Sequence, residues 1–130
     1  MSTSPVIQAW HDLVRSRDMA ALQRILADDV VFHSPVVHTP QVGKAITFKY
    51  LMGAMHALNT AAFHYERELV GPHDALLEFV TEIDGVKVNG IDLIRWNDAG
   101  QITDFKVMVR PLKAVNAVHA AMGAMLQRLG

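Results

Sequence analysis

The feature that most constrains the fold is a change in the hydrophobic period close to Asn59. Before this residue, apolar side chains recur every three or four positions, as they do on one face of an α-helix. Beyond it, over residues 63–109, apolar and polar residues alternate, which is typical of half-buried strands. Helices that precede a run of hairpins predict an α+β domain whose helices cover one face of an antiparallel sheet.

Two short helices are predicted at the start of the chain. Ser4 is a good N-cap and Pro5 is tolerated at the first helical position, so the first helix is expected to begin there. A second helix restarts at Asp18, and Asp28-Asp29 is expected to end it. Together they form a predicted helical hairpin.

A third helix and a set of strands complete the expected fold. Residues 44–58 favour a helix that is apolar on more than one side and is therefore buried. Asp84-Gly85 is a strong signal for a two-residue hairpin turn, and a last helix is expected from Ala114 to Leu129. The predicted strands are residues 30–33, 63–70, 77–83, 87–96 and 102–109.

Composition excludes several classes of function. The chain has 130 residues, a formal net charge of -1 and no basic cluster, so we expect a single domain over residues 1–130 that does not bind nucleic acid. The absence of cysteine excludes disulfides, thiolate metal sites and a cysteine nucleophile. No signal-peptide pattern and no apolar run of membrane-spanning length is present, so we expect a cytoplasmic protein without a membrane partner.

Three stretches of the sequence resemble the nuclear transport factor 2-like superfamily, and most closely its SnoaL-like polyketide cyclases and ketosteroid isomerases. They are residues 27–35, residues 43–50 and residues 90–102, the last containing an Asp in mid-strand before a hairpin that ends in Gly-x-Ile. The resemblance implies a cone-shaped, curved antiparallel (mixed) sheet wrapped around a long helix, with an N-terminal helical hairpin and an extra C-terminal helix. It also implies a homodimer that forms through the outer sheet face, and acid–base chemistry without a cofactor.

Asp92 is the main catalytic candidate. Strand alternation places Gly90, Asp92, Ile94 and Trp96 on one face. If that face lines the cone, burial raises the pKa of Asp92, and a neutral carboxylic acid there can donate a hydrogen bond to an oxygen that gains charge. The alternative is that Asp92 faces solvent or pairs with Arg95 or Lys87.

The isomerase pattern is only partly present. By resemblance, Asp92 stands where those enzymes have an oxyanion-binding Asp, and Tyr50 matches a pocket Tyr on the third helix. Ser34 stands where their catalytic base, an Asp before Pro, would be, and His11, beside Trp10, stands in place of an oxyanion Tyr. The loss of this base argues against steroid isomerisation by the mechanism of those enzymes.

His33 is a second catalytic candidate, because a histidine can act as a base near neutral pH. Alternation places His33 and Ser34 on opposite faces, so a structural role for His33 stays open. The seven histidines show no metal-ligand spacing, and no metal site is predicted. The expected ligand-binding residues are His11, Ser34, Tyr50, Phe79, Trp96, Phe105, Val107 and Val109.

Two functions remain open from sequence. The first is a cofactor-independent enzyme of the isomerase, cyclase or lyase type, acting on an apolar carbonyl or enone compound, with His33 or His11 as candidate base. The second is a non-catalytic module that binds a small apolar molecule or dimerises. An enzyme would need at least two titratable groups at one cavity, whereas Asp92 alone there would favour binding.

Overall fold

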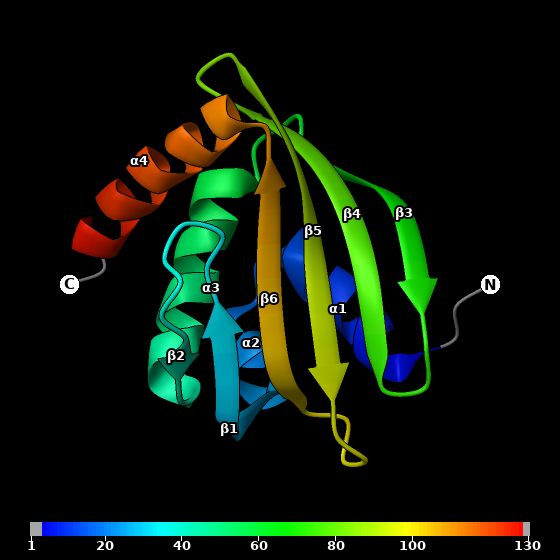
Figure 1. Ribbon diagram of the computed structural model, residues 1–130. Coiled ribbons are helices and arrows are strands. Elements are labelled where there is room, and N and C mark those ends of the chain that lie inside the picture. The colour runs from blue at the N-terminus through cyan, green and yellow to red at the C-terminus, as the bar shows by residue number, and fades with distance from the viewer. Residues whose placement is uncertain (1–3, 129–130) are drawn as a thin grey trace.

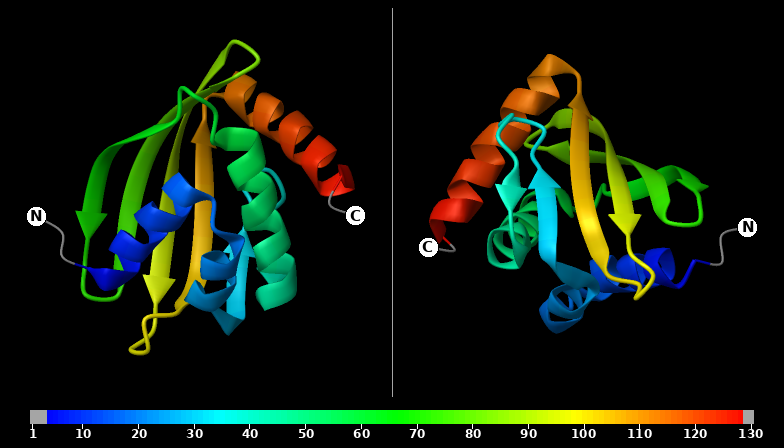
Figure 2. Two further views of the ribbon diagram at one scale, coloured as in Figure 1. Left: turned by 180° about the vertical axis from the view of Figure 1, so that it is seen from behind. Right: turned by 60° about the horizontal axis from the view of Figure 1, so that its bottom comes forward.

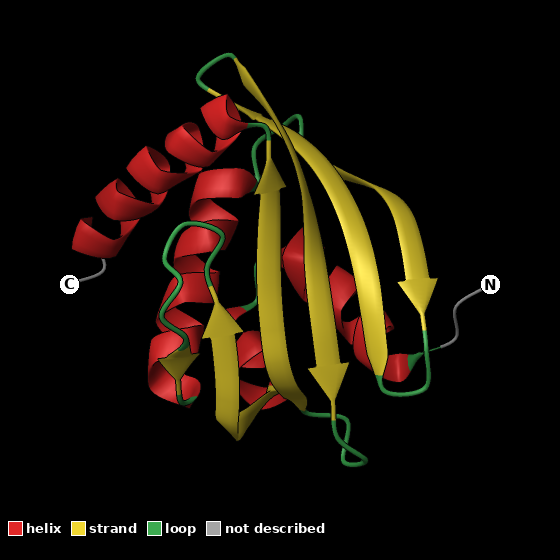
Figure 3. Ribbon diagram, in the orientation of Figure 1, coloured by secondary structure: helices red, strands yellow, loops and turns green. Residues whose placement is uncertain are grey.

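The computed structural model describes residues 4–128 as a curved sheet with helices on its concave side (Figure 1). The view from behind in Figure 2 shows the helices in front of the sheet, and Figure 3 separates the two kinds of element by colour. The helices are α1 (Pro5–Ser16), α2 (Met19–Ile25), α3 (Lys44–Leu58) and α4 (Leu112–Arg128). The strands are β1 (Leu26–His33), β2 (Gln41–Val42), β3 (His64–Val70), β4 (Asp74–Ile83), β5 (Val86–Trp96) and β6 (Ile102–Arg110).

The six strands form one sheet in the order β2-β1-β6-β5-β4-β3. β1 runs parallel to β6, and the other neighbours are antiparallel. The mixed, curved sheet predicted by resemblance is therefore confirmed. Between β1 and β6 the chain passes through β2, α3 and strands β3 to β5. The parallel pair of β1 and β6 therefore joins distant parts of the sequence.

Local signals in the sequence account for the first two helices. The Ser4 side chain accepts a hydrogen bond from the Ile7 N–H, so the predicted N-cap is confirmed. Asp18, where the second helix was predicted to begin, accepts a hydrogen bond from the Ala21 N–H and caps α2. α1 ends because Arg17 adopts a left-handed conformation, with φ 56°. The side chain of Arg17 then donates a hydrogen bond to the carbonyl of Asn59, which ties α1 to the end of α3.

The predicted role of Asp28-Asp29 is wrong. α2 ends at Ile25, and both aspartates lie inside β1, where their side chains are exposed. The register between β1 and β6 shifts between Leu26 and Val31, which leaves this polar pair at an irregularity of the sheet rather than at a helix end.

The helix over residues 44–58 is confirmed with the expected bounds, and so is the tight turn between β4 and β5. Asp84 and Gly85 have φ of 49° and 80°, the left-handed pair that a type I′ hairpin turn requires. α4 begins at Leu112, two residues before the prediction; Leu129, its expected end, lies outside the described residues. No helix in residues 4–128 is long and apolar enough to cross a membrane.

Candidate functional site

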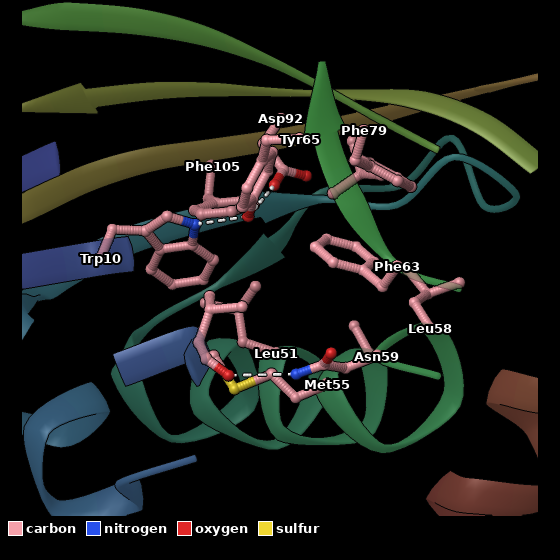
Figure 4. Close-up of a pocket in the computed structure, with 13 residues that line it drawn as sticks. Trp10, Leu51, Met55, Leu58, Asn59, Phe63, Tyr65, Phe79, Asp92 and Phe105 are labelled. Carbon is pink, nitrogen blue, oxygen red and sulfur yellow. Dashed lines mark hydrogen bonds between the residues drawn. The ribbon is translucent and has the colours of Figure 1, made fainter. Parts of the chain in front are cut away.

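A cavity lies between the concave face of the sheet and helices α1 and α3, with about 420 Å³ of empty space that is partly open to solvent (Figure 4). Pockets for small molecules are mostly apolar with a few convergent polar groups. This cavity has that composition. Its lining residues are Trp10, Val14, Leu51, Ala54, Met55, Leu58, Asn59, Phe63, Tyr65, Phe79, Asp92, Phe105 and Val107.

Asp92 faces this cavity from β5. Val88, Gly90, Ile94 and Trp96 are buried on the same face of the strand, and the residues between them are more exposed, so the predicted alternation is confirmed. Only 7% of Asp92 is exposed. Burial raises the pKa of its carboxyl to about 7, and the hydrogen bond from Tyr65 opposes that rise. Asp92 forms no ion pair with any residue in the described part of the chain.

A chain of hydrogen bonds leads to Asp92 from the opposite wall. The indole N–H of Trp10 donates to the phenolic oxygen of Tyr65 at 3.0 Å, and the Tyr65 hydroxyl donates to Oδ2 of Asp92 at 3.4 Å. Burial, and secondly the charge of Asp92, raise the pKa of Tyr65 well above its usual value, so Tyr65 stays protonated. The bond to Asp92 is long for an O–H···O contact, so a ligand oxygen at this place could compete for the hydroxyl.

Tyr65 is the functional candidate that sequence reasoning missed. It comes from β3, and its phenol meets Asp92 because β3 pairs with β4 and β4 with β5. The available signal was the alternation over residues 63–70, which places Phe63 and Tyr65 on one face. Tyr65 satisfies the requirement for a second titratable group beside Asp92. Among the residues that line the cavity, these two are the only titratable ones.

Gly90 shapes the floor of the cavity. It lies opposite Phe79 on the neighbouring strand, and a Cβ at this position would stand 2.4 Å from Cζ of the Phe79 ring. The glycine therefore lets the ring lie flat across β5. Phe79 in turn stacks on Phe63 with ring centroids 5.4 Å apart.

The structure brings three of the expected ligand-binding residues to the same cavity as Asp92: Phe79, Phe105 and Val107. His11 stays outside. Its Nε2 lies 2.7 Å from a carboxylate oxygen of Glu68, and its ring packs on that of Tyr65 in a T-shaped arrangement. Trp10, the residue before it, points inward instead. Trp96 is buried but does not line the cavity, and neither does Val109.

His33 is not brought to Asp92. Phe32, the residue before it, points inward, so His33 lies on the outer face of the sheet, with Nε2 2.9 Å from Oδ1 of Asp104. Ser34 caps a local turn by accepting hydrogen bonds from the N–H groups of Val36 and Val37. Ser34 and Tyr50 line a second cavity, on the other side of α3. In residues 4–128, no cluster of three or more His, Cys, Asp or Glu side chains could hold a metal ion.

Comparison with known proteins places these features in a family. Residues 7–105 match the model of the SnoaL-like domain. The structure of a steroid delta-isomerase from Pseudomonas aeruginosa is 34% identical, with a TM-score of 0.90 over 95% of this chain and 90% of that one. An uncharacterised bacterial protein with a cystatin-like fold, from Silicibacter pomeroyi DSS-3, is 30% identical, with a TM-score of 0.86 over 94% of this chain and 85% of that one.

More distant structures share the fold alone. A nuclear transport factor 2-like protein from Mesorhizobium loti is 20% identical, with a TM-score of 0.70 over 82% of this chain and 88% of that one. A search of curated proteins gave no match. The family match covers most of the chain and includes the strand that carries Asp92. The chain therefore belongs to the SnoaL-like domain family.

Proposed function

We propose that this protein is a small-molecule enzyme that performs acid–base chemistry, of the isomerase, cyclase or lyase kind, on an apolar carbonyl or enone compound. The observation that carries the proposal is the environment of Asp92. Its carboxyl is buried in an apolar cavity, has a pKa of about 7 and lies 3.4 Å from the hydroxyl of a second titratable residue, Tyr65. Strongly shifted pKa values of this kind cluster at functional sites.

Each group has a distinct chemical role in the proposed reaction. Tyr65, held protonated by its surroundings, donates a hydrogen bond to the substrate carbonyl oxygen as negative charge develops there. The indole N–H of Trp10 binds the Tyr65 oxygen and so orients the phenol. Asp92, with a pKa close to physiological pH, exists in both protonation states and can both take and return a proton.

Asp92 is the only carboxylate among the lining residues, and no histidine lines the cavity. Proton removal from carbon therefore falls to Asp92 itself. In the ionised form it takes the proton from the carbon beside the carbonyl, and the electron pair of that C–H bond delocalises onto the carbonyl oxygen. The same carboxyl then returns the proton to a more distant carbon, which shifts the double bond. A single residue thus serves as base and then as acid.

The relative that is a steroid delta-isomerase makes a double-bond shift the first reaction to test. The substrates are cyclic β,γ-unsaturated ketones of increasing ring number, and the conjugated product is followed by ultraviolet absorbance. We expect Asp92→Asn to lower kcat by about a hundredfold or more, the usual cost of losing an essential acid–base or oxyanion group. Asp104→Asn is the matched control, because Asp104 lies on the outer face of the sheet. Equal turnover in wild type and Asp92→Asn would contradict the proposal.

A binding module remains the alternative function, favoured by a cavity wall in which eleven of the thirteen residues are not titratable. In that case ketones and phenols would raise the melting temperature without being converted. A ligand at a hundredfold its Kd stabilises a protein by about 2.7 kcal/mol, which a thermal-shift assay detects easily. Stabilisation that is the same in wild type and in Asp92→Asn, with no turnover, would decide for binding.

The homodimer stays a prediction. The outer face of the sheet carries exposed apolar side chains, among them Leu69 and Met108, between the charged residues Glu78, Glu82 and Arg95. A second copy of the protein bound to this face would cover both the apolar and the charged side chains. We expect light scattering after gel filtration to give twice the chain mass of 14.4 kDa, and Met108→Glu to shift the mass toward the monomer. A wild-type monomer at high micromolar concentration would refute the dimer.

A further inference from the structure

A second cavity, with about 690 Å³ of empty space that is partly open to solvent, lies on the side of α3 that faces α4. Its walls come from α3, α4, strand β1 with the segment after it, and strand β6. Most of the lining is apolar, and the lining residues include no Asp, Glu, Lys or Arg. The side chains with polar atoms are Ser34, Tyr50 and His119. We call this cavity the distal compartment.

The distal compartment and the cavity at Asp92 have three lining residues in common: Ala54, Leu58 and Val107. Ala54 and Leu58 lie one turn apart on α3, and Val107 faces them from β6. The same three side chains are thus exposed to empty space on both sides. Ala54 contributes only a methyl group to this shared wall, the smallest of the three side chains.

α4 forms the outer wall of the distal compartment. Of its 17 residues only Ala114 and Val118 are buried, so the second half of the helix packs less closely on the rest of the protein. In this half, the side chains of Met122 and Leu126 lie opposite Gly53 of α3. A Cβ at Gly53 would be 3.4 Å from Cε of Met122 and 3.7 Å from Cδ2 of Leu126. Flexible methionine and leucine side chains form a wall that can adapt to an occupant. Figure 2 shows α4 running obliquely beside α3.

We propose that the two cavities are parts of one binding site for an elongated substrate, an enone or ketone with an unbranched apolar chain that passes Ala54 into the distal compartment. The inference rests on the proposed function, because the carbonyl end is placed at Asp92 and Tyr65. An unbranched chain is the narrowest apolar group, so it needs a smaller displacement of the three shared side chains than a ring does. The alkyl chain of the substrate is uncharged at its far end, since the lining of the distal compartment offers hydroxyl and imidazole groups but no charged partner.

The test uses 4-alkylcyclohexenones with chains from ethyl to decyl, and their Kd values are measured by isothermal titration calorimetry. Burying each methylene is expected to tighten binding by about two- to fourfold until the compartment is full. Gly123→Leu fills the compartment from α4. A Cβ at Gly123 meets nothing within 4 Å, and leucine is a better helix former than glycine, so this variant is expected to fold. The ratio of the decyl to the ethyl Kd should then approach one.

Ala124→Leu is the matched control. It puts the same side chain on the next residue of α4, which is exposed and does not line the compartment, and it should keep the wild-type dependence on chain length. Ala54→Leu, at the shared wall, should also abolish the gain. Affinity that does not change with chain length, or a gain that survives Gly123→Leu, would overturn the inference.

The outcomes separate this inference from the proposed function. Turnover of short enones that depends on Asp92, without any gain from chain length, would leave the proposed function standing and refute the elongated substrate. Chain-length gains without turnover, unchanged in Asp92→Asn, would keep the compartment as a binding site and refute the chemistry. Tight binding of decane alone, with no contribution from the ketone, would refute a single site that joins the two cavities.

Discussion

Replacing Asp92 by Asn should stabilise the protein at high pH, because the folded state holds this carboxyl in surroundings that disfavour its charge. Its pKa is about 7 in the folded protein against 3.8 in a model compound, a difference of about three units. Each unit corresponds to about 1.4 kcal/mol, so ionised Asp92 lowers the free energy of unfolding by roughly 4 kcal/mol. Asn is nearly the same shape, is uncharged at every pH, and can accept the Tyr65 hydrogen bond.

The sign of the pH dependence follows from proton binding. Between about pH 4 and pH 7 the folded state binds the Asp92 proton more tightly than the unfolded state does, so stability falls as pH rises. Below that window Asp92 is neutral in both states, and above it the loss is complete. The stability difference between Asp92→Asn and wild type should therefore be small near pH 4, grow through the window, and level off at about 4 kcal/mol above pH 7.

Urea denaturation of both proteins at one-unit pH steps measures this difference. Asp29→Asn is a suitable control for the loss of one negative charge, because Asp29 is exposed on β1. Subtracting the wild-type curve removes the contributions of other groups that titrate alike in both proteins. A difference that stays constant from pH 4 to pH 8 would refute the argument that burial controls Asp92.

Three further predictions concern neighbouring residues. Tyr65→Phe removes the hydrogen bond that favours the ionised form, so it should raise the pKa of Asp92 further, which is measurable from the pH profile of kcat/KM; an unchanged or lower pKa would contradict this. Gly90→Ala should lower the free energy of unfolding by about 1–3 kcal/mol in urea and weaken ligand binding, because the added methyl group pushes Phe79 into the cavity; wild-type stability would count against it. His33→Gln should leave kcat/KM unchanged, and a tenfold loss would show that the outer face takes part in the reaction.

The fold could be predicted largely from local patterns. The third helix is confirmed because its residues favour helix over the whole span 44–58, and the β4–β5 turn is confirmed because Asp-Gly favours two successive positive φ angles. Asp28-Asp29 misled the prediction for a physical reason. A polar pair usually ends an element, but here it lies at a register shift between β1 and β6, and that pairing joins distant parts of the sequence.

For the candidate site, too, local patterns could be predicted from the sequence and contacts between distant strands could not. Asp92 could be placed because alternation within one strand determines which way it points. Tyr65 could not, because its meeting with Asp92 spans 27 residues and depends on the registers of two strand pairs, one of which shifts between Tyr65 and Arg67. The prediction named His11 as a cavity residue, whereas the structure places its neighbour Trp10 there. Adjacent residues on a helix point about 100° apart, so only one of the two can face the cavity.

The departure at Ser34 has a consequence for the chemistry. Two carboxylates at one site raise the pKa of one of them through like-charge repulsion, but here no second carboxylate lines the cavity, and burial is the main cause of the raised pKa of Asp92. Its proton affinity therefore depends on how dry the cavity is. An apolar substrate that displaces water should raise this pKa further, so that a smaller fraction of Asp92 is in the ionised form that takes the proton from carbon, while a developing charge on the substrate oxygen draws the Tyr65 hydroxyl away from Asp92. In this arrangement the substrate itself helps to set the protonation state of the group that acts on it.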